Sequence, residues 1–322
     1  MTTDTQSLDP ATLAHLQSWV GKTETLTDDI TAAPLRGLAA TLDRDDPPFV
    51  AGTTVPPLWH WLYFLPQPRR SEIGPDGHAR RGGFLPPVPL PRRMWAGGRL
   101  QWLQDNPLVL GDAIKRVSRI ESVTHKSGRS GNLVFVLVKH EIRNAHGLAL
   151  TEEHDIVYRA NAPAPTLGTG VSSLPSEGAE LARGGPSLRS APGDPLPAPQ
   201  PAAKDAAWTE TVTPDDVLLF RYSALTFNGH RIHYDRKYVT EVEGYPGLIV
   251  HGPLIATLLL GLLRNKLPDA RLTHFEFRAV RPVFDMSPFK LHGKPSADGK
   301  TVALWTEDHA GWLSMQATAT LA

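Results

Sequence analysis

The 322-residue sequence contains no cysteine. The chain therefore cannot carry a disulfide framework, a thiol nucleophile or a zinc site built on thiolates. It also has no excess of either charge, because 33 basic side chains balance 33 acidic ones. Without a long-range field we expect no nucleic-acid and no membrane partner, and an anionic ligand would need a local site. The sequence has no G-x-S-x-G motif and no Walker loop, which argues against serine hydrolases and nucleotide hydrolases.

Targeting and membrane-spanning segments are not expected either. No basic residue precedes Lys22 and no apolar core follows the first residues, so neither a secretory signal nor an Arg-rich transit peptide is indicated. The longest uncharged run, residues 244–263, is interrupted by glycines and prolines. Its uninterrupted part, residues 253–263, is too short to cross a bilayer as a helix. We therefore expect a soluble, cytoplasmic protein.

Proline marks a boundary inside the chain. Nine of the 30 prolines lie between residues 160 and 207, in a segment rich in Ala, Gly and Ser and without an aromatic residue. Such a composition buries too little apolar surface to offset its ordering entropy, so a flexible linker is predicted over residues 161–207. It would join an N-terminal domain, residues 1–160, to a C-terminal domain, residues 208–322.

The two predicted domains echo each other in sequence. TETLTDDI, residues 23–30, reappears as TETVTPDDV, residues 209–217, and VPPL at 55–58 is echoed by HGPL at 251–254. The first pair predicts a strand followed by a capped helix, with Thr213 as the cap of the second copy. The second pair opens an apolar stretch, which in the second copy is apolar all round and should be buried.

Alternating residues then predict strands in both halves. These are expected at residues 114–123, 133–142, 155–159, 275–280, 289–293, 302–306 and 313–321. In each half the order becomes capped helix, loop, apolar helix and strands. It predicts an α+β fold in which an antiparallel sheet curls around one buried helix, made twice.

The stretch richest in chemistry is RYSALTFNGHRIHYD, residues 221–235. Asn228 and His233 lie five residues apart with His230 between them, and His251-Gly252-Pro253 opens the apolar helix shortly afterwards. Asn-Gly is also a common turn dipeptide, so Asn228 and Gly229 alone would indicate only a hairpin. Histidine is the side chain that exchanges protons most readily near neutral pH, which makes the segment a candidate catalytic site.

Residues 226–233, followed by 247–254, resemble the hydratase signature of MaoC-type hot dog enzymes, S-G-D-x-N-P-[LIV]-H with a later HG at the start of the hot dog helix. Residues 86–98 resemble the degenerate dehydratase half of fused two-hot-dog hydratases. The resemblance covers both halves but not the linker. It implies a double hot dog fold and a hydro-lyase without cofactor that reversibly adds water to an α,β-unsaturated acyl-CoA thioester.

The same resemblance assigns catalytic roles. The family's catalytic His falls on His233 and its catalytic Asp falls on Asn228. An amide exchanges no proton near neutral pH, so Asn228 is expected to orient water and His233 to act as general acid and base. Gly252 would donate its N–H to the enolate oxygen. No His lies between His15 and His60, so the first half is expected to shape the pocket rather than catalyse.

The favoured substrate by resemblance is a small branched C5 dicarboxylyl-CoA such as mesaconyl-C4-CoA. Its carboxylate and the CoA phosphates would call for arginine, and the pocket residues expected are Arg231, His230, His251, Arg93 and Trp95, with Arg92 and Arg278 as further candidates. Of these, His251 is expected to be a hydrogen-bonded structural histidine. Its grouping with His230 and His233 lacks a carboxylate at a recognisable metal-site spacing, so no metal is expected.

Three other functions remain open. A 3-hydroxyacyl-thioester dehydratase of fatty acid metabolism would use the same fold on a longer apolar chain. An acyl-CoA thioesterase would release free thiol. A non-catalytic acyl-thioester binding protein is suggested by the missing aspartate at position 228, and the sequence leaves open whether the protein is a homodimer.

Overall fold

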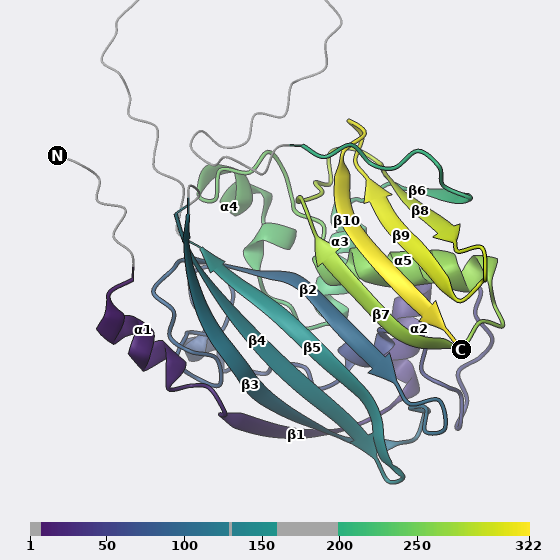
Figure 1. Ribbon diagram of the computed structural model, residues 1–322, viewed down its shortest axis with the longest axis horizontal. Helices are drawn as coiled ribbons and strands as arrows, with labels where there is room; N and C mark the ends of the chain where they lie inside the picture. The colour runs from purple at the N-terminus through teal and green to yellow at the C-terminus, as the bar shows by residue number, and fades with distance from the viewer. Residues whose placement is uncertain (1–7, 129–130, 160–198) are drawn as a thin grey trace, which may run out of the picture.

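The computed structural model describes residues 8–128, 131–159 and 199–322 (Figure 1). The first half contains α1 (Pro10–Gln17), β1 (Thr23–Asp29), α2 (Ala32–Thr41), the 3-10 helices η1 (Trp59–Leu62) and η2 (Arg70–Glu72), β2 (Arg92–Trp102), β3 (Ala113–Gly128), β4 (Gly131–Asn144) and β5 (Gly147–Arg159). The second half contains β6 (Trp208–Val212), α3 (Asp216–Leu225), η3 (Arg231–His233), α4 (Arg236–Glu241), α5 (Gly252–Lys266), β7 (Leu272–Ala279), β8 (Phe289–Pro295), β9 (Thr301–Glu307) and β10 (Leu313–Leu321).

The strands of the described residues form one sheet in the order β1-β3-β4-β5-β2-β7-β10-β9-β8-β6. Read inward from its two edges, the sheet shows β1-β3-β4-β5-β2 on one side and β6-β8-β9-β10-β7 on the other. Each half therefore repeats the topology of the other, as the sequence echoes predicted. The predicted α+β fold is confirmed, and the strands predicted in both halves are present in extended form.

The two halves join where β2 pairs with β7, and this junction depends on glycine. Gly97 faces Arg278 across the pair, and a Cβ added to Gly97 would lie 2.5 Å from the carbonyl oxygen of Phe277. That approach is closer than a real Cβ contact, so a larger residue would push the strands apart. Strand β2 escaped prediction because Gly97 and Gly98 break the alternation that marks a strand.

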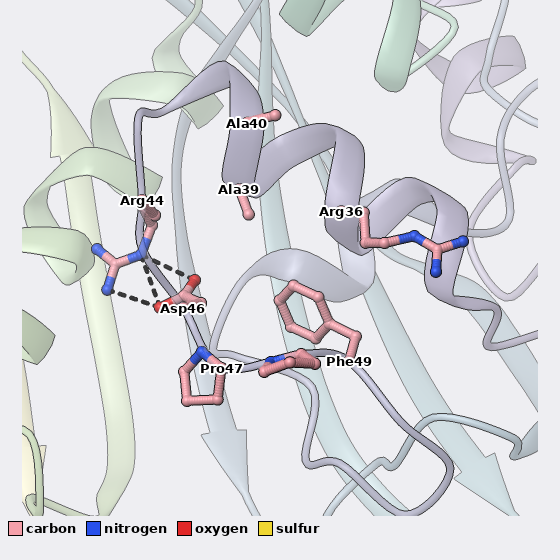
Figure 2. Close-up of a pocket in the computed structure, with 8 residues that line it drawn as sticks. Arg36, Ala39, Ala40, Arg44, Asp46, Pro47 and Phe49 are labelled. Atoms are coloured by element: carbon pink, nitrogen blue, oxygen red, sulfur yellow. Dashed lines mark hydrogen bonds and ion pairs between the residues drawn. The ribbon is translucent and has the colours of Figure 1, made fainter.

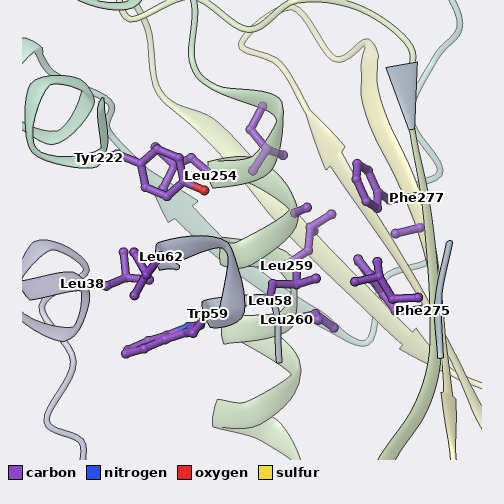
Figure 3. Close-up of a cluster of buried hydrophobic side chains, with 14 of the residues drawn as sticks. Leu38, Leu58, Trp59, Leu62, Tyr222, Leu254, Leu259, Leu260, Phe275 and Phe277 are labelled. Atoms are coloured by element: carbon purple, nitrogen blue, oxygen red, sulfur yellow. The ribbon is translucent and has the colours of Figure 1, made fainter. Parts of the chain in front are cut away.

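Helix α5 is the centre of a core that both halves share. Leu254, Leu259 and Leu260 are almost fully buried, which confirms the prediction that this apolar helix is wrapped by other structure. Figure 3 shows α5 with Phe275 and Phe277 of β7 on one side. Residues of α2, η1 and α3 lie on the other side, namely Leu38, Trp59, Leu62 and Tyr222.

The prediction of an apolar helix after residues 55–58 is wrong. Only the short helix η1 forms there, and Leu58 before it and Phe64 after it both have left-handed backbone conformations, with φ 69° and 55°. Pro66 follows at once and also prevents a helix from extending. In the first half η1 therefore packs against α5 where a second central helix was expected.

The predictions that a helix begins after β1 and another after β6 are confirmed, with one correction. Helix α3 is capped by Asp215, whose side chain accepts a hydrogen bond from Leu218 N at 2.7 Å, and not by Thr213. Asp215 is extended, with φ −139° and ψ 170°, so Pro214 lies before the helix rather than inside it. The aspartate satisfies one of the free N–H groups of the first turn.

Most of the predicted linker, residues 161–198, lies outside the described residues. Residues 199–207 lie against the second half, where Ala202 is buried and its N–H donates to Gly311 O at 3.0 Å. The division into two domains remains a prediction. None of the helices in the described ranges is both long and apolar enough to cross a membrane.

Candidate active site

The segment after α3 turns sharply at Asn228. Phe227 has a left-handed backbone conformation (φ 48°), and Asn228 N donates to Ser223 O at 2.8 Å, which closes the end of the helix. The Asn228 side-chain oxygen accepts from His230 N at 3.0 Å, a turn typical of asparagine. The amide therefore keeps its NH2 group available, and no protein partner for that group occurs within the described ranges.

His233 has a defined tautomer. Its Nδ1 lies 2.7 Å from the carbonyl oxygen of Ile249, and because a carbonyl only accepts, Nδ1 carries the proton. The neutral ring then has a lone pair on Nε2. Burial lowers the pKa of His233 to about 4, against an opposing effect of the Ile249 hydrogen bond. At neutral pH His233 is therefore an uncharged base.

His251 supports His233 from the start of α5. The two rings are stacked with centroids 3.7 Å apart, and His251 Nε2 lies 2.8 Å from Ser223 Oγ. His251 is 1% exposed, and its Nδ1 has no hydrogen-bond partner among the described residues. Burial, with the neighbouring histidines, lowers its pKa well below the usual value. The structural and pocket roles expected of His251 remain predictions.

Gly252 is the first residue of α5, and His251 before it is the N-cap residue, whose side chain makes no hydrogen bond to the helix. The first hydrogen bond of the helix runs from Ile255 N to His251 O, so the Gly252 N–H has no intrahelical partner. A Cβ added to Gly252 would meet no atom within 4 Å, so this end of the helix faces open space. The helix dipole adds partial positive charge at the same point.

Four histidine rings lie in sequence along the site. His78 and His230 have ring centroids 4.0 Å apart, His230 and His233 5.5 Å, and His233 and His251 3.7 Å. We call His78, His230, His233 and His251 the imidazole row. Burial is the largest cause that lowers the pKa in each of them, to about 2 for His230.

His78 and its neighbour Asp76 are residues that sequence reasoning missed. They belong to a tight turn of the first half, residues 74–78, closed by a bridge between Ile73 and Ala79. The Asp76 carboxylate accepts two hydrogen bonds within this turn, from His78 N at 3.0 Å and from His78 Nδ1 at 3.3 Å. The GPDGH sequence indicates a turn, but no local pattern reveals its contact with residues about 150 positions away.

Asp76, His78 and His230 also carry donor atoms that all lie within 4.8 Å of one another. Two imidazoles and a carboxylate form a donor set that divalent metals accept. Here Asp76 and His78 engage each other in a hydrogen bond, so their contacts are those of an Asp–His pair.

The predicted arginines fall into different surroundings. Arg93, on β2, lies close enough to His78 and His230 for its charge to lower their pKa values. Arg93 also forms a side-chain hydrogen bond with Tyr158. Arg231 bonds to Asp235 at 2.7 and 3.0 Å and lies over the Tyr238 ring at 4.0 Å.

Two further candidates point elsewhere. Arg92 bonds to Tyr245 and to the main chain of Glu243, and Arg278 is exposed on β7. Trp95 donates to Gly97 O and packs against aromatic rings, as a pocket wall would. The binding roles of all these residues remain predictions.

The first half contains a sealed polar cluster instead of an open site. Glu152 is 5% exposed and accepts from Trp61 Nε1 at 3.1 Å, while His60 Nε2 lies 3.0 Å away. Burial alone would raise the pKa of Glu152, but the His60 hydrogen bond and nearby histidines lower it to about 2. The cluster holds η1 to the sheet.

An open pocket of about 280 Å³ lies elsewhere, along α2 and the segment that follows it. Figure 2 shows Arg44 turned onto Asp46 and Arg36 pointing away from that pair. None of the predicted site residues lines this pocket. Its lining comprises Arg36, Ala39, Ala40, Arg44, Asp46, Pro47, Pro48 and Phe49.

Known proteins resemble the chain along most of its length. A family model described as hydroxyacyl-thioester dehydratase type 2 matches residues 58–179 and 187–285. Mesaconyl-C(4)-CoA hydratase of Chloroflexus aurantiacus is 43% identical over 288 residues, which are 88% of this chain and 91% of that protein. The two segments of the family match contain the whole imidazole row and Asp76.

Solved structures show the same fold at low sequence identity. A MaoC-like dehydratase, 15% identical, superposes with a TM-score of 0.64 over 95% of this chain and 99% of its own. A Mycobacterium tuberculosis protein described as having a double hotdog fold, 16% identical, gives 0.51 over 94% and 96%. The predicted double hot dog fold is confirmed.

Proposed function

The chain belongs to the hydroxyacyl-thioester dehydratase type 2 family, and from that premise we propose that it hydrates mesaconyl-C4-CoA, with His233 as the general base. A hydro-lyase of this family adds water to, or removes it from, an acyl thioester. The observation that carries the catalytic assignment is the hydrogen bond between His233 Nδ1 and Ile249 O, which leaves Nε2 unprotonated.

The residues present can perform each part of hydration. His233 Nε2 takes a proton from water while the water oxygen bonds to the β carbon of the substrate. The electron pair of the double bond moves onto the thioester oxygen, where the Gly252 N–H stabilises the developing charge. The α carbon takes up a proton from a second acid or from solvent as the enolate collapses, and His233 releases the proton that it took from water. Dehydration follows the same steps in reverse.

Asn228 contributes position rather than proton transfer. Its oxygen is held by His230 N at 3.0 Å, and its NH2 group can donate to the oxygen of the attacking water. An amide in this place fixes where water sits. It cannot accept the proton of that water, so the acid–base work falls on the histidines.

The substrate assignment rests on similarity and on Arg93. The Chloroflexus relative is named for a CoA thioester of a dicarboxylic acid. Arg93 brings a positive charge near His78 and His230, where a free carboxylate of the acyl group can bind. A 3-hydroxyacyl thioester without a second carboxylate is the alternative substrate, and it is favoured by the description of the family model.

One assay separates these functions. Loss of enoyl-thioester absorbance is followed with mesaconyl-C4-CoA and with crotonyl-CoA, and a thiol reagent runs in parallel. Hydration of the first substrate with the higher kcat/KM and without thiol release supports the proposed function. A preference for crotonyl-CoA would favour the alternative, and thiol release without hydration would indicate a thioesterase.

A further inference from the structure

Asn228 leaves the site one proton-exchanging group short of the signature that its sequence resembles. The missing carboxylate would lie in the turn at residues 228–230. Across that turn the structure places Asp76, a carboxylate from the other half of the protein.

The turn at residues 74–78 is docked firmly on the catalytic segment. Arg231 N donates to Asp76 O at 2.9 Å, and Arg231 Nη1 donates to Pro75 O at 3.0 Å. Gly77 approaches Gly229 so closely that a Cβ on Gly77 would lie 1.8 Å from Gly229 O. Only glycine fits at Gly77, where φ is also +90°. The position of Asp76 relative to Asn228 is therefore fixed by the main chain.

We propose that the Asp76–His78 pair is the second proton-exchanging unit of the active site and replaces the carboxylate that the family signature places at position 228. This role presupposes the hydration reaction proposed above. In it His78 carries the proton and Asp76 is a positioning residue, which holds the His78 ring through Nδ1. The centroid of the His78 ring lies 4.0 Å from that of the His230 ring. The main-chain N–H of His230 donates to the side-chain oxygen of Asn228.

Within the imidazole row, His78 is the ring hydrogen-bonded to a carboxylate. Burial lowers its pKa and Asp76 opposes that effect, so protonated His78 is a minor species at neutral pH and a correspondingly strong acid. The His78 side chain is 23% exposed, whereas His233 and His251 are buried. The charged or titratable groups that face it are Asp76, which favours its protonated form, and Arg81, Arg93 and His230. Partial exposure also lets the pair exchange protons with solvent between turnovers.

The proton balance of the reaction closes with two histidines. His233 takes one proton from water as the oxygen bonds to the β carbon. The protonated His78 gives a proton to the α carbon, directly or through one water, as the enolate collapses. His233 then releases its proton to solvent and His78 regains one, so the net change is addition of one water molecule.

The test is a set of variants assayed for hydration of mesaconyl-C4-CoA at several pH values. Asp76→Asn keeps the main-chain oxygen that binds Arg231 N, and His78→Gln keeps a polar side chain of similar size. We expect each to lower kcat by about 100-fold, the range of one general acid, with little change in KM or melting temperature. Asn228→Asp added to His78→Gln should restore about tenfold or more, because it returns a carboxylate to position 228.

The pH profile separates this role from a structural one. In wild type, kcat/KM should fall as pH rises above the lowered pKa of His78, because the protonated fraction of its ring then decreases. Because the carboxylate favours protonated His78, Asp76→Asn should move this loss to lower pH, and His78→Gln should remove it. A purely structural role would lower the rate at every pH without moving the profile.

The contradicting results are equally specific. Asp76→Asn and His78→Gln variants within twofold of wild type would overturn the assignment, as would a loss that Asn228→Asp does not restore. If only Gly77→Ala, which dislodges the turn, abolishes activity, the turn is structural. If dialysis against EDTA removes activity and ZnCl2 restores it, the three donors hold a metal. Should wild type hydrate no thioester while binding it, the proposed function itself fails.

Discussion

The imidazole rings of His233 and His251 stack 3.7 Å apart with their planes inclined by 17°. Both rings are buried, and burial is the largest cause that lowers each pKa. A proton on either ring would place a charge in an apolar site beside its neighbour. The pair is therefore neutral at physiological pH, and this neutrality is what makes His233 a base.

The first prediction concerns the acid limb of activity. Because the pKa of His233 is lowered to about 4, kcat/KM for hydration should not decline as pH falls from 7 towards 5 and should decline only near 4. Steady-state rates in constant ionic strength buffers measure this, with reversibility checked by return to pH 7. An acid limb centred near 6.5, the ordinary value for histidine, would contradict it.

The second prediction concerns stability. His140 and His154 have pKa values lowered by burial, to about 4 and about 3, whereas the unfolded chain binds protons near 6.5. Between these values the unfolded state binds more protons, so the free energy of unfolding should fall as pH falls below 6.5 and be fully retained above 7. Urea unfolding at pH 7.5, 6.0 and 5.0 measures the decline.

A matched variant controls that measurement. His154→Gln removes one of the titrating groups, so its stability should depend less steeply on pH than that of wild type. Each proton involved contributes about 1.4 kcal/mol per pH unit. Equal slopes for the two proteins would show that His154 is not one of the groups responsible.

The third prediction concerns the N–H of Gly252. Gly252→Pro removes the donor but suits the first position of a helix, while Gly252→Ala keeps the donor and enters open space. The proline variant should lose about 100-fold or more in kcat, and the alanine variant should remain close to wild type. Equal losses in both would point to the added carbon atoms rather than to the missing N–H.

The fourth prediction concerns substrate recognition. Arg93→Met should raise KM for mesaconyl-C4-CoA about tenfold or more and leave KM for crotonyl-CoA nearly unchanged, because only the first acyl group has a free carboxylate. Arg278→Met, on an exposed position of β7, is the control. If KM rises equally for both substrates, Arg93 binds a part common to them, such as the CoA moiety.

The fifth prediction concerns the junction of the halves. Gly97→Ala would bring its Cβ to 2.5 Å from Phe277 O, whereas Gly83→Ala meets no atom within 4 Å. The first substitution should destabilise the protein by about 1–3 kcal/mol and the second should have little effect. Chemical unfolding of the two variants in parallel decides this, and comparable stabilities would mean that β2 and β7 separate without cost.

Local patterns in the sequence predicted those parts of the fold that depend on neighbouring residues. The apolar run that becomes α5 and the alternation of apolar and polar residues in the strands of the second half are both visible within short stretches of sequence. His233 and Gly252 also follow from short motifs. Strand β2 does not, because Gly97 is explained only by the close approach of Phe277 O from the other half.

The remaining part of the site is non-local. Asp76 and His78 reach His230 only because the two halves share one sheet, and no spacing along the chain encodes that contact. The missing helix after residues 55–58 has the same origin. Its place in the core is filled by α5, so the first half needs only the four residues of η1.

The most direct test of the catalytic account is the steady-state rate of mesaconyl-C4-CoA hydration by wild type, His233→Ala and His233→Gln at pH 7.5. If His233 is the base, both variants should lose about 100- to 10,000-fold in kcat while they fold and still bind the thioester. Rates within a few-fold of wild type in two folded variants would contradict the account, since a group other than His233 would then take the proton from water.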